Sequence, residues 1–271
     1  MGGTIRTRLA ATALTGFIAL LPACAHMDGR TPDAAALYDA IERDDAGYIR
    51  ASVQSGALGV NQSIPVPGYS EGTPLITVAA RSGALQVLRY LLSAGADANA
   101  RTPIGETALM LASYFSSEDR ERGGDPRQRH DEAVRMLLAA GAEVDNHPHH
   151  YTPLCYAAYN GNDTAVQLLL ARGARVDGSA ENGSTYVNTP LMMAAMQGHT
   201  STALQLLRAG ANAAVRVHGG HTAAELAAKY RHAELARLLQ CAERHGKEGF
   251  AAHHCPGRTS ERNASRMSAE R

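Results

Sequence analysis

The amino-acid sequence predicts an all-α repeat solenoid, in which helix-turn-helix units stack side by side with β-hairpin loops between them. Three observations support this fold class. A Thr-x-Leu start recurs every 33 to 45 residues, an apolar run ending in glycine follows each full copy, and a polar, turn-rich segment comes next. The starts lie at Thr73, Thr107, Thr152, Thr189 and, in degenerate form, Thr222. The terminating glycines are Gly95, Gly141, Gly173 and Gly210.

Each unit follows the same physical pattern. We expect threonine to cap the first helix through its hydroxyl, with proline at the first helical position, as in Thr152-Pro153. Alanine pairs follow in most units, as at Ala157 and Ala158, and allow neighbouring helices to approach closely. The second helix is more apolar, and the terminal glycine then ends it in a left-handed conformation.

This order of motifs, TPLxxAA, a turn glycine, LLxxGADxNA and a final GxT, resembles the ankyrin repeat. The segment Gly95–Ala112 is the cleanest copy. The resemblance implies an ankyrin domain over residues 34–242, with capping repeats at 34–61 and 221–244 and with Asp44 at a usual glycine position. Four central repeats are expected: Thr73–Arg101, Thr107–Asn146, Thr152–Asp177 and Thr189–Arg216.

Insertions interrupt the repeat in three places. Three segments are longer than the pattern requires: the connection "SIPVPGYSEG", residues 116–131 and the hairpin after Gly173. Insertions in repeat proteins fall in loops and often carry function. The alternative is tolerated surface variation, because lengthening a loop is thermodynamically inexpensive.

The first residues read as a targeting signal. Arg6 and Arg8 precede the apolar run Leu9–Leu21, which is too short to span a bilayer as a helix. We therefore expect a signal peptide over residues 1–23. The ending "LPAC" resembles the bacterial lipobox, which implies acylation of Cys24, a lipidated linker over 24–33 and a periplasmic chain held at the outer membrane. Cleavage after Ala25 is the alternative, and an uncleaved anchor fits less well.

Charge excludes one class of partner. The chain has 26 basic and 26 acidic residues, so it lacks the basic footprint of a nucleic-acid-binding protein. The sequence likewise shows no nucleophile elbow, phosphate loop or dinucleotide fingerprint, and we expect no catalytic residues, no cofactor and no enzyme activity. Residues 243–271 are polar and aperiodic, which is typical of a disordered tail.

Histidines and cysteines suggest an alternative function in metal handling or redox protection. His147, His149 and His150 share one hairpin, and His253, His254 and Cys255 lie in the tail downstream of Cys241 and His245. Their spacing matches no zinc-finger framework, so we expect no metal site. Cys241 and Cys255 could pair in an oxidising compartment, although the sequence does not establish the pairing. Cys155 is expected to be buried and alone.

The leading hypothesis is a non-enzymatic, monomeric interaction module that binds a protein partner on its concave face. Tyrosines gather on the middle repeats, and tyrosine is enriched among interface hot spots. Tyr156 is instead assigned to the core, because it takes the position that leucine usually holds in the repeat, and Tyr90 is assigned a structural role in its second helix. By position in the ankyrin repeat, the partner-binding residues are expected to be Arg101, Ile104, Tyr114, Phe115, His149, Tyr151, Tyr159, Asn160, Tyr186, Met196, Gln197, His218 and His221.

Overall fold

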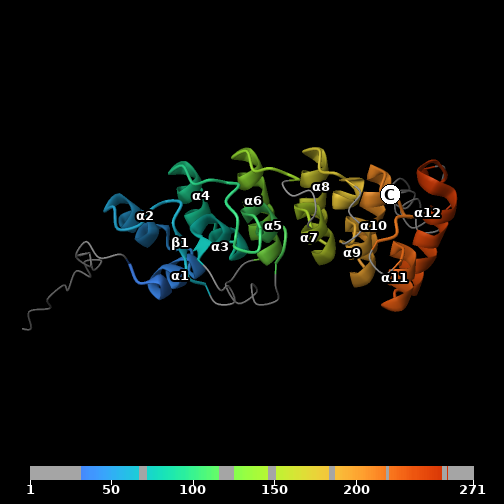
Figure 1. Ribbon diagram of the computed structural model, residues 1–271, viewed down its shortest axis with the longest axis horizontal. Helices are drawn as coiled ribbons and strands as arrows, with labels where there is room; N and C mark the ends of the chain where they lie inside the picture. The colour runs from blue at the N-terminus through green and yellow to red at the C-terminus, as the bar shows by residue number, and fades with distance from the viewer. Residues whose placement is uncertain are drawn as a thin grey trace, which may run out of the picture.

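A computed structural model shows a single row of helix pairs running the length of the molecule (Figure 1). The first helix of each pair follows the lower edge of the row, and the second helix follows the upper edge. This arrangement confirms the predicted all-α repeat solenoid. The structure describes residues 32–66, 72–115, 125–145, 151–182, 187–217, 220–251 and 255, with the backbone alone at 181, 182 and 247–251.

Six pairs of helices make up the described row. The first helices are α1 (Ala34–Glu42), α3 (Leu75–Arg81), α5 (Ala108–Ala112), α7 (Pro153–Asn160), α9 (Pro190–Gln197) and α11 (Ala223–Lys229). The second helices are α2 (Ala46–Gln54), α4 (Leu85–Ser93), α6 (Pro126–Ala139), α8 (Asp163–Ala171), α10 (Thr200–Ala209) and α12 (Ala233–Ala251). Their buried leucine, valine and alanine side chains form one continuous core from Leu37 to Cys255.

Strand structure is confined to the loops between the pairs. Strands β1 (Ser63–Ile64) and β2 (Thr73–Pro74) pair antiparallel, with Ile64 opposite Thr73. A single bridge joins Arg101 to Thr107 in the next loop. The extended hairpin after α8 contains the 3-10 helix η2 (Gly178–Asn182).

A threonine caps the N-terminus of four of the five first helices for which a threonine cap was predicted. The hydroxyls of Thr107, Thr152, Thr189 and Thr222 accept hydrogen bonds from the backbone N–H groups three residues later. Thr73 is the exception, and its predicted capping role is wrong. The first central repeat has an extra residue before its turn, so Thr73 lies in β2, Pro74 takes the cap position and α3 begins at Leu75.

The glycines that follow the second helices adopt the expected left-handed backbone, with φ between 84° and 101°. Asp44 is left-handed too, with φ of 57°, at the position where the repeat usually has glycine. Its carboxylate compensates for the backbone conformation. Oδ1 accepts hydrogen bonds from the N–H groups of Gln86 and Val87 at 2.8 and 2.9 Å, and so caps α4 of the next repeat.

Neighbouring hairpins are held in register by a ladder of side chains. In each step, a side-chain oxygen of one hairpin accepts a hydrogen bond from a backbone N–H of the next, at 2.7 to 3.0 Å. The acceptors are Asn61, Asn99, Asp145 and Asp177, and the donors are Asp97, Glu143, Arg175 and Asn212. Because every step joins two repeats, the ladder fixes the spacing of the stack as well as its loops.

The last helix differs from the expected disordered tail. Helix α12 continues past residue 242 to Ala251, with a break in helical geometry at Gly246 (φ 62°, ψ −171°). Residues 252–254 and 256–271 lie outside the described residues, as do residues 1–31. None of the helices described is both long and apolar enough to cross a bilayer.

Candidate protein-binding face

Three tyrosine rings meet where α5 and α7 lie side by side. Tyr114 lies two residues after α5, and its ring centroid lies 6.3 Å from that of Tyr159 and 6.4 Å from that of Tyr156 on α7. The contact with Tyr156 is edge-to-face, which is a favoured aromatic geometry. All three rings are half-buried, so each keeps part of its apolar area accessible to a partner.

Polar contacts fix the position of this aromatic cluster. The Tyr156 hydroxyl donates to Glu106 Oε1 at 2.9 Å, and Asn160 Nδ2 donates to the Phe115 carbonyl at 2.7 Å. The Arg127 guanidinium lies over the Phe115 ring at 5.5 Å. The assignment of Tyr156 to the core was wrong, because its hydroxyl requires a polar partner and the side chain is therefore only half-buried.

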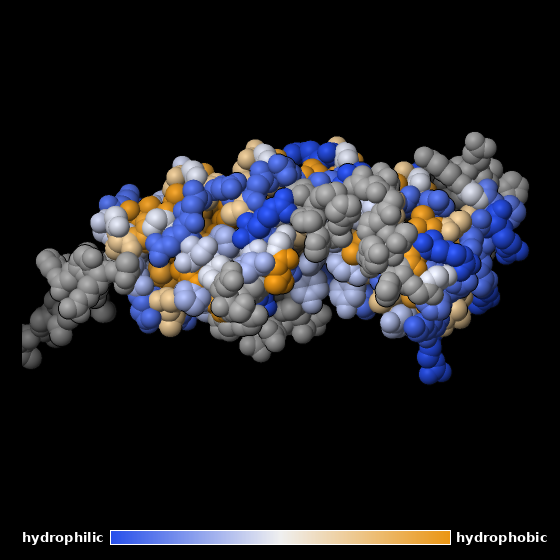
Figure 2. Space-filling model, viewed as in Figure 1, coloured by the Kyte–Doolittle hydropathy of each residue, from blue (hydrophilic) through white to orange (hydrophobic). Residues whose placement is uncertain are grey.

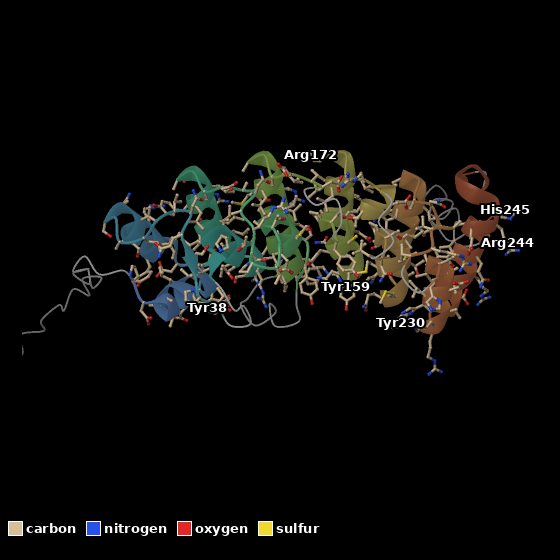
Figure 3. The ribbon with its side chains drawn as sticks, in the orientation of Figure 1. Tyr38, Tyr159, Arg172, Tyr230, Arg244 and His245 are labelled. Atoms are coloured by element: carbon tan, nitrogen blue, oxygen red, sulfur yellow. A yellow bond between two sulfur atoms is a disulfide. The ribbon has the colours of Figure 1, made fainter. Side chains whose placement is uncertain are left out.

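The same positions on the neighbouring repeat extend the cluster into a longer surface. Met193 and Met196 on α9 occupy the register positions of Tyr156 and Tyr159, and both are half-buried. Tyr230, at the end of α11, is 45% exposed and lies on the same lower edge as Tyr159 (Figure 3). We call this surface the first-helix ribbon; it comprises Tyr114, Tyr156, Tyr159, Met193, Met196 and Tyr230.

The ribbon carries no charge along its central part. Three register positions line it in the repeats of α5, α7 and α9, and all of them hold apolar, aromatic or amide side chains. Charged residues occupy equivalent positions in the other described repeats, at Asp39, Glu42, Arg43, Arg81 and Lys229. The uncharged positions are Leu111, Tyr114, Phe115, Tyr156, Tyr159, Asn160, Met193, Met196 and Gln197.

Two histidines from the following repeats donate hydrogen bonds to main-chain carbonyls of the helices that carry the ribbon. His199 Nε2 donates to the carbonyl of Tyr159, and His232 Nε2 donates to the carbonyl of Met196, each at 3.1 Å. Each ring thus satisfies a carbonyl at the C-terminal end of a first helix, where the helix itself provides no donor. Burial lowers the pKa of His199 below its ordinary value, so the ring is neutral at pH 7.

The turn glycines make room for these rings. A Cβ at Gly161 would lie 2.6 Å from His199 Nδ1, and one at Gly198 would lie 2.5 Å from the His232 ring. Gly161 and Gly198 also have φ of 63° and 76°. Glycine is therefore required at both turns by the backbone conformation and by the close approach of the next repeat.

The structure brings together Tyr114, Phe115, Tyr159 and Asn160, with Met196 and Gln197 on the next helix. Other predicted partner-binding residues lie apart from this group. Ile104 is 66% exposed at a hairpin tip, Arg101 lies in the bridge to Thr107, and Tyr151 precedes the N-cap Thr152 of α7. His221 is exposed, with Nδ1 3.6 Å from Glu225 Oε2. The predicted residues His149, Tyr186 and His218, and the predicted lipidation site Cys24, lie outside the described residues.

Sequence reasoning missed Met193, Tyr230 and Arg127. Aligning the first helices on their turn residues would have identified Met193 and Tyr230, because both occupy ribbon positions. Arg127 lies at the start of α6, within the 116–131 insertion, and no repeat register connects it to Phe115. Its stacking on the ring depends on the path of the chain and has no signal in the sequence.

Of the cysteines that the structure describes, one is buried as a free thiol and two are paired. Cys155 is fully buried as predicted, and burial raises the pKa of its thiol to about 11. Cys241 and Cys255 form a disulfide with a Cα–Cα distance of 5.6 Å. Within the described part of the chain, no three His, Cys, Asp or Glu side chains gather as metal ligands. The histidines at 147, 149, 150, 253 and 254 lie outside that part.

Comparison with known proteins gives two kinds of match. Family models described as "Ankyrin repeats (3 copies)" and "Ankyrin repeats (many copies)" match residues 127–180 and residues 76–120 and 154–208, respectively. A mitochondrial disaggregase from Bos taurus is 31% identical over 166 residues, which are 61% of this chain and 22% of the relative. The chain therefore spans about a fifth of the length of that curated relative.

Proposed function

Because this chain belongs to the ankyrin repeat family, whose repeats generally mediate protein–protein interaction, we propose that it is a non-enzymatic module that holds a partner protein on its first helices. The observation that carries this proposal is the first-helix ribbon, where half-buried tyrosine and methionine side chains gather across three adjacent repeats. Tyrosine offers a large contact area at low entropic cost, and methionine adapts to irregular partners.

The partner chemistry follows from the charge distribution. The ribbon positions are uncharged over the repeats of α5, α7 and α9. The charged groups in contact with this part are Glu106, which accepts from the Tyr156 hydroxyl, and Arg127, which lies over the Phe115 ring, and Lys229 takes an equivalent position in the next repeat. Burying a charged side chain against an uncharged surface leaves it without compensation. The partner element is therefore a neutral, largely apolar stretch of polypeptide, with polar or acidic residues at its ends.

The location of the module is part of the same proposal. The chain is exported, and the lipid-anchored form held by Cys24 places the repeats in the periplasm at the outer membrane. The leader pattern of residues 1–23 supports export, and so does the Cys241–Cys255 disulfide, since disulfides persist in oxidising compartments. Mass spectrometry of the mature N-terminus from a Gram-negative host distinguishes acylated Cys24 from cleavage after Ala25.

Affinity capture from crosslinked envelopes tests the binding face. Wild type is compared with Tyr114→Ala/Tyr159→Ala, which removes two ribbon rings. The control Tyr48→Ala/Tyr90→Ala removes two half-buried rings from the second helices α2 and α4. A protein captured by wild type and by the control, but lost from the ribbon variant, supports the proposal. Equal capture by all three proteins contradicts it.

A further inference from the structure

Helix α12, the second helix of the last pair, buries side chains at positions that are exposed in the earlier second helices. Cys241 and Ala242 of α12 are buried, with 6% and 2% of their surface exposed. Register counted from the left-handed turn residue, or back from Gly141 in the repeat of α6, places them at positions that are exposed in each of the four central repeats. The equivalents of Cys241 are Ser93, Ala139, Ala171 and Arg208, and those of Ala242 are Ala94, Ala140, Arg172 and Ala209.

Two further positions show that the buried face of α12 is rotated about the helix axis relative to the buried faces of the earlier second helices. Leu238 is buried, whereas its equivalents Tyr90, Met136, Leu168 and Gln205 are half-buried. Gln240, in contrast, is exposed where the earlier repeats have a buried or half-buried leucine. The terminal helix therefore buries Leu238, Cys241 and Ala242 against an element that the central repeats lack.

The segment that follows Ala242 in the chain could cover these buried side chains. Every earlier second helix ends just before the hairpin, but α12 continues through Glu243, which takes the place of the terminal glycine. Gly246 then breaks the helical path with φ of 62° and ψ of −171°. The backbone resumes as helix to residue 251, and Cys255, itself buried, returns to bond with Cys241.

We propose that the helical segment after Gly246, together with Cys255, forms a cover over Leu238, Cys241 and Ala242, and that the Cys241–Cys255 disulfide fastens this cover. Figure 1 shows α12 at the right-hand limit of the row, with its C-terminal end at the upper edge. The cover completes the apolar core where the stack would otherwise end in solvent. It is independent of the first-helix ribbon and of the partner bound there.

Reduction opens the cover in a balanced step. A dithiol reductant transfers two electrons and two protons to the disulfide; the S–S bond of the protein breaks, and the reductant becomes a cyclic disulfide. The opening is local because other contacts hold α12 up to Glu243. The Thr222 hydroxyl donates to Glu243 Oε2 at 3.4 Å, and Arg216 lies 3.9 Å from Glu243 Oε1.

Alkylation with iodoacetamide, before and after treatment with dithiothreitol, tests the proposal on the oxidised full-length chain. Peptide mapping identifies which cysteines react, and hydrogen exchange follows the amides of residues 238–242. After reduction we expect Cys241 and Cys255 to be alkylated and these amides to exchange ~10-fold faster, as for a local opening. Cys155 remains unmodified, because it is buried in the core of a repeat that stays folded.

Two outcomes overturn the proposal. Unchanged exchange at residues 238–242 after complete reduction would show that the face is covered without the bond. Alkylation of Cys155 together with the other two would show that the whole stack opens. The variant Cys255→Ser should reproduce the exchange of reduced wild type without any reductant. The matched variant Cys155→Ser should leave the exchange at residues 238–242 unchanged.

Discussion

His199 Nε2 lies 3.1 Å from the main-chain carbonyl of Tyr159, so one repeat caps the helix that presents the aromatic surface of the repeat before it. The same relationship links His232 to Met196 one repeat later. Stacking and the geometry of the first-helix ribbon are therefore coupled, because the residues that join the repeats also hydrogen-bond to the helices that carry the ribbon.

Gly161→Ala is expected to destabilise the stack by about 2 kcal/mol or more. The new Cβ would lie 2.6 Å from His199 Nδ1, and the backbone keeps φ of 63°. Gly173→Ala is the matched control, because its φ is 84° but nothing lies within 4 Å of the new Cβ. Urea unfolding measures both. Equal losses for the two variants would contradict the steric role of His199.

Stability is expected to fall as pH falls through the range around and below 6.5. Burial lowers the pKa of His199 in the folded state, so the unfolded chain takes up a proton first and becomes favoured. The urea midpoint of wild type should therefore drop more between pH 7.5 and 5.5 than that of His199→Gln. A substitution of the exposed His245 should leave the wild-type dependence intact. An identical drop in wild type and His199→Gln would exclude His199 as the source.

Cys155 is expected to resist alkylation at pH 8 while the protein is folded. Its thiol has a pKa of about 11 because it is buried, and it donates to the Asn188 carbonyl at a sulfur–oxygen distance of 3.7 Å. The thiolate is the reactive form, so burial removes both access and nucleophile. Mass spectrometry after iodoacetamide treatment should show modification only in denaturant. Rapid native labelling would disprove this account of the site.

Asp44→Ala is expected to cost about 1–2 kcal/mol, because it removes the cap that accepts from Gln86 and Val87. Asp44→Asn should be milder, since its amide oxygen can accept and asparagine tolerates positive φ. Asp39→Ala, which breaks an exposed ion pair with Arg43, should change the melting curve little. Thermal unfolding compares the three variants, and the account fails if Asp44→Ala melts like wild type.

Much of the fold could be predicted because the signals are local and repeated. A threonine cap or a left-handed glycine is determined by a few adjacent residues, and its recurrence at a regular spacing identifies the solenoid. Thr73 was misassigned for the same reason: a single extra residue shifted the cap to Pro74, and the Thr-Pro-Leu motif hid that shift.

The site was predicted only in part, because its contacts join separate repeats. The register of the repeat placed Tyr114 and Tyr159 on one face, and the structure puts their rings 6.3 Å apart. The stacking of Arg127 on Phe115 and the pairing of Cys241 with Cys255 depend on chain paths that no periodicity describes. The helix after residue 242 was missed because a short polar segment carries no apolar period.

Apolar and polar residues are interspersed over the side of the stack shown in Figure 2, without one dominant apolar patch on that side. A binding face therefore has to be tested by position. Gln197 and Gln167 provide a matched pair, since both are exposed glutamines, one on the first helix α9 and the other on the second helix α8.

Site-specific photocrosslinking in intact cells, with a benzophenone amino acid at Gln197 or at Gln167, shows whether the partner lies on the first-helix ribbon. We expect a discrete adduct from position 197, its loss in the Tyr114→Ala/Tyr159→Ala background, and no adduct from position 167. An adduct from position 167 alone, or an adduct at 197 that survives loss of both tyrosines, would show that the partner is not held by the first-helix ribbon.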